Sequence, residues 1–167
     1  MKNIILVGMM SSGKTTLGKK LARILGYRFV DLDKLVEQDQ NMDIPSLFSQ
    51  KGETYFREVE SRILKEISIR RNMVLASGGG TPCFFDNMNL INQMGISIFL
   101  DVPAADLARR IENHGKDDRP ILSGAASLVE TLDQKIKERL PFYSQALITL
   151  KGDIDTSHLM QELKPLL

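Results

Sequence analysis

The sequence contains a single cysteine, Cys83, and carries almost no net charge. One cysteine excludes an intramolecular disulfide framework and a cysteine-rich zinc site. The 22 lysines and arginines balance 21 aspartates and glutamates, for a formal charge of +1. Because no overall basic field would attract nucleic acid or an anionic membrane, we expect a small molecule as the partner of this protein.

Long apolar runs are also missing. No stretch reaches the roughly 18 residues that span a bilayer. The apolar run near the N-terminus ends in Ser11-Ser12-Gly13-Lys14 instead of a small-residue cleavage site, so we interpret it as a buried strand and not as a signal peptide. We therefore expect a soluble, cytoplasmic protein and, by default, a monomer.

The length of 167 residues and the apolar fraction of 43% fit one domain with its own core and exclude a disordered or collagen-like chain. No internal repeat and no linker rich in proline, glycine and serine divides the sequence, so residues 1–167 are predicted to form a single domain.

Short β-rich runs alternate with longer helical segments. Strands are predicted at Ile4–Val7, Arg28–Asp31, Met73–Ala76, Ile96–Val102 and Ala146–Leu150. Helices are predicted at Lys14–Leu25 and around 34–50, 57–70, 104–112 and 127–140. This alternation predicts an α/β fold of three layers, α/β/α, around a central, mostly parallel five-stranded sheet.

A phosphate-binding motif follows the first predicted strand. The segment Gly8–Thr15 satisfies G-x-x-x-x-G-K-[ST] and stands directly before a predicted helix. In such a loop, backbone N–H groups surround the β-phosphate, Lys14 reaches the β and γ oxygens, and the Thr15 hydroxyl binds Mg²⁺. The motif predicts ATP and Mg²⁺ as ligands, against the alternative of a glycine-rich turn that binds nothing.

The phosphate loop alone does not identify the acceptor of the phosphoryl group, because switches, motors and small-molecule kinases all share it. A guanine-specificity motif of the Asn-Lys-x-Asp kind and a large force-transmitting arm are both missing. These absences favour a small-molecule kinase.

Two carboxylates, Asp31 and Asp33, lie just past the end of the second predicted strand, at the edge where open α/β sheets bind ligands. Alternation along an extended segment would direct both the same way. One could hold Mg²⁺ through water, and the other could orient an acceptor hydroxyl and take its proton. A helix N-cap at Asp33 is the alternative. Ser77 stands where many P-loop proteins have an aspartate, which points to Asp31 as the carboxylate near Mg²⁺.

Further candidates for the acceptor side are an arginine and a glycine run. Arg57 stands at an expected helix start with Glu60 three residues later, and an arginine braced in this way suits a planar carboxylate. A solvated salt bridge is the alternative. The run 78–80 consists of three glycines, which would let backbone approach a ligand closely. The segment His114–Pro120 could form a mobile lid or a plain connecting loop.

Taken together and in order, several motifs resemble those of the shikimate kinase family over nearly the whole chain. They are 8–16, 31–33, 52–60, 78–80, 118–122 and 139–143. The resemblance implies ATP-dependent phosphorylation of the 3-hydroxyl of shikimate, in aromatic amino acid biosynthesis.

The resemblance also implies residue roles. Asp33 would bind the acceptor hydroxyls and act as the base, and Arg57 and Arg139 would bind the shikimate carboxylate. Gly79 and Gly80 would line the acceptor pocket, whose region spans about 33–60. Arg119, on a lid at about 113–124, would close onto the ATP phosphates. The nucleotide-binding residues would be Ser11, Ser12, Gly13, Lys14, Thr15 and Thr16.

Two departures from the family pattern concern the nucleotide. Ser11 replaces a customary glycine of the loop, and the segment 151–155 is acidic where relatives commonly place an arginine beside adenine. Arg110 is a candidate for that position. Another small kinase, such as a gluconate kinase, and a nucleotide-dependent switch stay open as alternatives. We expect no chemistry from His114, His158 or Cys83.

Overall fold

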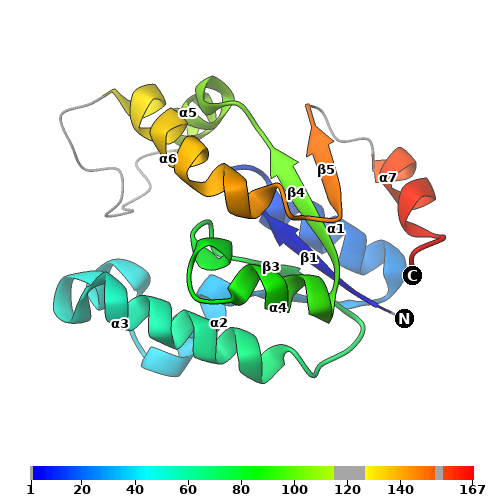
Figure 1. Cartoon of the computed structure of the whole chain (residues 1–167), viewed down its shortest axis with the longest axis horizontal. Coiled ribbons are helices and arrows are strands. Elements are labelled where there is room, and N and C mark those ends of the chain that lie inside the picture. The colour runs from blue at the N-terminus through cyan, green and yellow to red at the C-terminus, as the bar shows by residue number, and fades with distance from the viewer. Residues whose placement is uncertain (1, 115–126, 153–155) are drawn as a thin grey trace.

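The computed structural model describes residues 2–114, 127–152 and 156–167, and in these ranges the chain builds one five-stranded sheet (Figure 1). Its strands are β1 (Asn3–Val7), β2 (Arg28–Asp31), β3 (Met73–Ala76), β4 (Gly95–Asp101) and β5 (Ile148–Lys151). Their order is β2-β3-β1-β4-β5, and all four neighbouring pairs are parallel. The predicted sheet is confirmed, and no described pair of strands is antiparallel.

The helices are α1 (Lys14–Leu25), α2 (Leu32–Gln40), α3 (Ile44–Ile67), α4 (Asn87–Met94), α5 (Ala104–Asn113), α6 (Leu128–Tyr143) and α7 (Thr156–Leu163), with a short 3₁₀ helix, η1 (Thr81–Cys83). Helices α4 and α7 were not predicted. Helix α1 ends as predicted, with Gly26 in the left-handed conformation at its C-cap.

The sheet is buried on both faces, which confirms the three-layer arrangement. Along β1, Ile4 and Leu6 belong to a core cluster with side chains of α1 and α7. Ile5 and Val7 point the opposite way, into the larger cluster formed with α3, α4, α5 and α6. Because β1 pairs with β3 on one side and β4 on the other, its apolar run has no polar face, as a central parallel strand requires.

The helical region after β2 differs from the prediction. One helix was expected over about 34–50 and the next from 57, but the first of these is broken at Asn41–Asp43. Asn41 adopts a left-handed φ of 49° there, and Asp43 caps α3 by accepting a hydrogen bond from Ser46 N (2.7 Å). Gly52, with φ 80° and ψ 170°, is non-helical and divides α3 into two helical stretches at a kink, within the break that was expected between residues 50 and 57.

The parallel strands bring three sequence motifs to one edge. In the sheet register Ala76 of β3 lies between Leu6 of β1 and Asp31 of β2. The phosphate loop, the Asp31 region and the glycine run therefore leave the sheet side by side, at the carboxyl edge. None of the helices in the described ranges has the length and apolar content needed to cross a membrane.

Candidate active site

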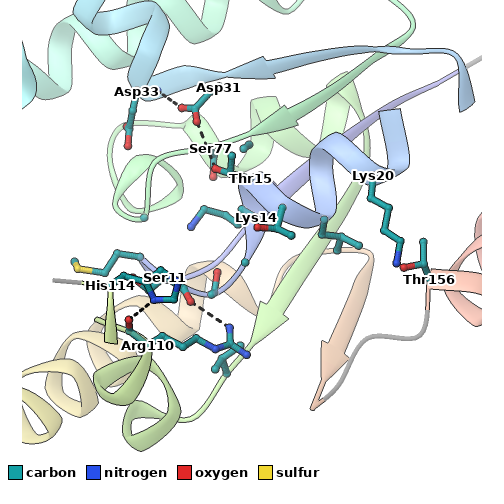
Figure 2. A pocket seen from close by; sticks show the side chains of 18 of the residues that line it. Ser11, Lys14, Thr15, Lys20, Asp31, Asp33, Ser77, Arg110, His114 and Thr156 are labelled. Carbon is teal, nitrogen blue, oxygen red and sulfur yellow. Dashed lines mark hydrogen bonds between the residues drawn. The ribbon is translucent and has the colours of Figure 1, made fainter. Parts of the chain in front are cut away.

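A cavity of about 610 Å³ opens at the carboxyl edge of the sheet (Figure 2). The phosphate loop and the first turns of α1 form one wall, and the ends of β2 and β3 form another. Its lining includes Ser11, Ser12, Gly13, Lys14, Thr15, Thr16, Lys20, Asp31, Asp33, Ser77, Gly79, Arg110, His114 and Thr156. The predicted phosphate-side residues are thus brought together.

The phosphate loop follows a path that depends on left-handed backbone at several positions. Gly8 has a φ of 142°, and a Cβ on it would lie 2.9 Å from the carbonyl oxygen of Leu100 on β4. Gly13 has a φ of 99° at the N-cap of α1. Ser11 adopts a φ of 61°, a conformation that glycine accepts without steric cost and a serine rarely adopts. The chain therefore keeps a glycine-like path at Ser11 and accepts the strain there.

Lys14 is folded over its own loop. Its Nζ donates hydrogen bonds to the carbonyl oxygens of Gly8 (2.8 Å) and Met9 (2.7 Å), and the residue is buried. Two carbonyl dipoles thus hold the ammonium group inside the curve of the loop, beside the cavity (Figure 2). A phosphate in the loop would meet this charge together with the N-terminal end of α1.

Asp31 joins the phosphate loop to β2. Its Oδ2 accepts a hydrogen bond from Thr15 Oγ1 (3.4 Å), and its Oδ1 accepts from the backbone N–H groups of Asp33 (3.1 Å) and Lys34 (3.4 Å). Asp31 is therefore the N-cap of α2, and the alternative of an N-cap at Asp33 is wrong. The expected strand-like alternation of Asp31 and Asp33 is also wrong, because helix α2 begins at Leu32. Both carboxylates nevertheless line the cavity (Figure 2).

The pair Thr15 and Asp31 fits a magnesium ion. A hydroxyl and a carboxylate oxygen are hard ligands, and they lie close together beside the phosphate loop. In the described part of the chain, no three or more histidines, cysteines, aspartates or glutamates cluster as a metal-binding group.

The glycine run 78–80 makes room for three functional side chains. A Cβ on Gly78 would lie 2.7 Å from Glu60 Oε2 and 2.9 Å from Asp33 Oδ1. A Cβ on Gly80 would lie 2.6 Å from Cζ of Arg57, and one on Gly79 would lie 3.1 Å from Nη1 of Arg139. The run therefore brings Asp33, Arg57 and Arg139 around one stretch of backbone.

Arg57 is buried and braced on several sides. Its Nη1 donates to Glu60 Oε1 (2.9 Å), and its Nη2 contacts Glu53 Oε1 (3.3 Å). The rings of Phe84 and Phe56 lie 4.4 Å and 5.0 Å from Cζ, within cation–π range. The predicted pairing with Glu60 is confirmed and the solvated alternative is wrong, since Arg57 is only 4% exposed.

Arg57 was expected near a helix start, and it follows by five residues the non-helical Gly52, after which the second helical stretch of α3 begins. Its partner Glu60 is buried, and Glu60 Oε2 accepts a hydrogen bond of 2.6 Å from Thr81 Oγ1. Burial raises the pKa of Glu60, while Arg57 and the Thr81 hydroxyl oppose that rise.

Arg139 comes from α6 and is held differently. It is 7% exposed, and Nη1 contacts the sulfur of Met9 at 3.5 Å. None of the carboxylates in the described ranges pairs with it. One turn later on α6, the Tyr143 hydroxyl donates to the carbonyl oxygen of Gly79. Neither Arg57 nor Arg139 lines the 610 Å³ cavity itself; both stand behind the glycine run.

Arg110 and His114 close the other side of the cavity. Arg110 Nη1 donates to the carbonyl oxygen of Ser11 (3.1 Å), so this guanidinium lies against the phosphate loop (Figure 2). His114 Nδ1 lies 2.7 Å from the carbonyl oxygen of Arg110. Arg119 and the expected lid beyond His114 lie outside the described residues.

The sequence analysis missed several residues of the cavity wall, among them Lys20 and Thr156. Lys20 extends from α1 toward Thr156 at the start of α7 (Figure 2). Lys20 follows Thr16 by four residues on the same helix face, a spacing that could have revealed it. Thr156 could not be found, because α7 was not predicted.

Cys83, in η1, is partly buried beyond the glycine run. Burial raises the pKa of its thiol to about 11, although Arg139 and Arg57 oppose the rise. The thiol is therefore protonated at neutral pH.

Comparisons with known proteins identify the family of this chain. The sequence model of the family described as "Shikimate kinase" matches residues 10–166. A shikimate kinase from Parabacteroides distasonis is 39% identical over 155 residues, 92% of this chain and 89% of the relative. The structure of shikimate kinase from Acinetobacter baumannii in complex with shikimate has a TM-score of 0.88 at 33% identity, over 98% of this chain and 90% of that one.

More distant structures share only the fold. A gluconokinase from Sinorhizobium meliloti has a TM-score of 0.59 at 13% identity, over 96% of this chain and 88% of that one. The family match, by contrast, covers the phosphate loop from Met10 onward and both buried arginines. On the extent of that match and the identity to its curated relatives, this chain belongs to the shikimate kinase family.

Proposed function

We propose that this protein transfers the γ-phosphoryl group of ATP to the 3-hydroxyl of shikimate, giving shikimate 3-phosphate and ADP in aromatic amino acid biosynthesis. The observation that carries the proposal is the glycine run, which packs two buried arginines behind the cavity that the phosphate loop lines. A relative of this fold has been solved with shikimate bound, and shikimate carries one carboxylate and several ring hydroxyls. Two buried arginines behind the cavity suit that carboxylate.

In the proposed reaction, Arg57 and Arg139 bind the acceptor carboxylate, and Gly79 and Gly80 let the ring approach the backbone. Asp33 accepts a hydrogen bond from the 3-hydroxyl and takes its proton as the oxygen attacks the γ-phosphorus. The bond between the γ-phosphorus and the bridging oxygen breaks, and ADP leaves with that electron pair. Lys14 balances the charge that develops on the β and γ oxygens.

The proposed nucleotide site consists of Ser11, Ser12, Gly13, Lys14, Thr15 and Thr16, with Arg110 against the loop. Thr15 would hold Mg²⁺ directly and Asp31 would hold it through water. When bound, the cation supplies neutralising charge for the phosphate oxygens. We also propose that Arg119, on a lid at about 113–124, closes onto the phosphates and excludes water, and that the enzyme is a cytoplasmic monomer.

A coupled ADP-release assay tests the proposal. Purified protein is given ATP and Mg²⁺ with shikimate, with gluconate or with no acceptor. We expect ADP release that depends on shikimate and saturates, with shikimate 3-phosphate identified by phosphorus NMR. Release with gluconate alone would move the acceptor to another polyhydroxy acid. Folded protein that binds ATP but releases no acceptor-dependent ADP would contradict the kinase function and favour a nucleotide-dependent switch.

A further inference from the structure

The two buried arginines of the acceptor pocket differ in how their charge is balanced. Arg57 forms ion pairs with Glu53 and Glu60, whereas Arg139 forms none with any carboxylate of the described ranges. Arg139 is nonetheless buried, with only 7% of its surface exposed. A buried cation with no carboxylate at ion-pair distance keeps more of its attraction for an incoming anion, but it needs another group to fix its direction.

Two side chains contact the Arg139 guanidinium, those of Met9 and Tyr143. The sulfur of Met9 lies 3.5 Å from Nη1 of Arg139 and 3.7 Å from the Tyr143 hydroxyl, and Met9 is almost fully buried. A thioether is a neutral, weak hydrogen-bond acceptor. It can therefore orient a guanidinium without cancelling its charge, which a carboxylate at the same place would do.

Gly79 and Tyr143 complete this arrangement. The Tyr143 hydroxyl donates to the carbonyl oxygen of Gly79, and the ring of Tyr143 packs against Phe99 at 5.0 Å between centroids. Because Gly79 has no side chain, the space next to Nη1 of Arg139 stays open; a Cβ there would lie 3.1 Å from this nitrogen. The sulfur of Met9 thus sits in a fixed frame that includes β4, α6 and the glycine run.

Met9 also belongs to the phosphate loop, and its carbonyl oxygen accepts a hydrogen bond from Lys14 Nζ (2.7 Å). The main chain of Met9 thus contacts Lys14, on the side of the phosphoryl donor. Its side chain contacts Arg139, on the proposed acceptor side. We propose that Met9 is a positioning residue, whose thioether directs Arg139 toward the carboxylate of the acceptor. The proposal rests on the proposed function and goes beyond it, by assigning a role to a side chain of the phosphate loop.

The test is Met9→Leu, which keeps an apolar side chain of similar volume and removes the acceptor. We expect the KM for shikimate to rise roughly fivefold, with kcat and the KM for ATP changed less than about twofold, as for the loss of one weak bond to a charged group. Met94→Leu is the matched control, because Met94 is buried in the same core cluster away from the cavity. It should leave all three constants unchanged.

Two further variants separate positioning from simple packing. Met9→Gln supplies a neutral carbonyl acceptor of similar reach, and it should return the KM for shikimate to within about threefold of wild type. In an Arg139→Lys background, Met9→Leu should have almost no additional effect on shikimate binding measured by calorimetry, because its effect acts through Arg139.

The outcomes are distinct. An active Met9→Leu enzyme with wild-type KM for shikimate would overturn the inference. So would equal losses in kcat and in both KM values together with a lower melting temperature, or full additivity with Arg139→Lys. Wild-type protein that phosphorylates no shikimate would instead contradict the proposed function, and this result is obtained before any variant is compared.

Discussion

Thr15 Oγ1 and Asp31 Oδ2 are joined by a hydrogen bond of 3.4 Å. Thr15 lies in the first turn of α1, after β1, and Asp31 is the last residue of β2. The other oxygen of Asp31 caps α2 by accepting from two backbone N–H groups. One carboxylate therefore serves both the proposed magnesium site and the start of the helix that carries Asp33. A substitution has to separate these two roles.

Asp31→Asn makes that separation, because asparagine caps helices about as well as aspartate but carries no charge. We expect the Mg²⁺ concentration for half-maximal activity to rise about tenfold, as is typical when an outer-shell partner of a metal is lost. The melting temperature should change little. A magnesium titration of the rate and a thermal melt measure both.

The control for Asp31→Asn is Asp43→Asn, since Asp43 is the exposed N-cap of α3 and accepts from Ser46 N outside the cavity. This variant should leave the magnesium dependence unchanged. If the two variants shift the magnesium titration equally, Asp31 has no special role near the cation.

Asp33→Asn tests the proposed base. The amide cannot accept the proton of the attacking hydroxyl, so kcat should fall by about 10² to 10⁴-fold, whereas the Kd of a nucleotide analogue should stay within about twofold. Steady-state kinetics and calorimetry measure the two quantities. A variant with undiminished kcat would remove Asp33 from proton transfer.

Gly80→Ala places a methyl group in the space of the Arg57 guanidinium, 2.6 Å from its Cζ. The guanidinium has to move, and we expect the KM for shikimate to rise at least about tenfold with little change in the KM for ATP. Gly26→Ala is the comparison, because it strains a left-handed C-cap where nothing lies within 4 Å. That variant should lower the melting temperature and leave the KM for shikimate intact.

Cys83 gives a prediction that depends on pH. The pKa of the Cys83 thiol is raised to about 11, so the thiolate fraction at pH 7 is very small. This fraction should grow about tenfold for each unit by which the pH increases toward the pKa. The rate of alkylation by iodoacetamide, followed by mass spectrometry, should therefore keep rising between pH 7 and pH 10. N-acetylcysteine is the control for intrinsic reactivity. A rate that levels off below pH 9 would contradict the raised pKa.

Local patterns were enough to predict the strands and the phosphate loop. Ile4–Val7 is continuous in apolar residues, and the glycine and lysine of the loop stand at fixed offsets behind it. Pairing of Arg57 with Glu60 is also local, because three residues on a helix bring side chains to one face. Each of these features depends on neighbours in the sequence.

Features that depend on tertiary packing were missed. Helix α4 contains three asparagines, Asn87, Asn89 and Asn92, which are poor helix formers, and the helix is stabilised by burial of Met88 and Ile91. The contact of Met9 with Arg139 joins residues 130 positions apart, so no spacing rule could indicate it. The start of α2 at Leu32 was missed because Asp31 both ends β2 and caps α2. In the sequence, such an aspartate looks the same as one that continues the strand.

The kink at Gly52 has a consequence for mutational tolerance. Gly52 is only partly buried, and a Cβ built on it would meet nothing within 4 Å, so by available space alone every small residue would be accepted there. Its φ of 80° and ψ of 170° lie in a region that is essentially restricted to glycine. A saturation-mutagenesis profile of the chain should therefore show an intolerant position on α3 with an empty neighbourhood, where the backbone alone selects the residue.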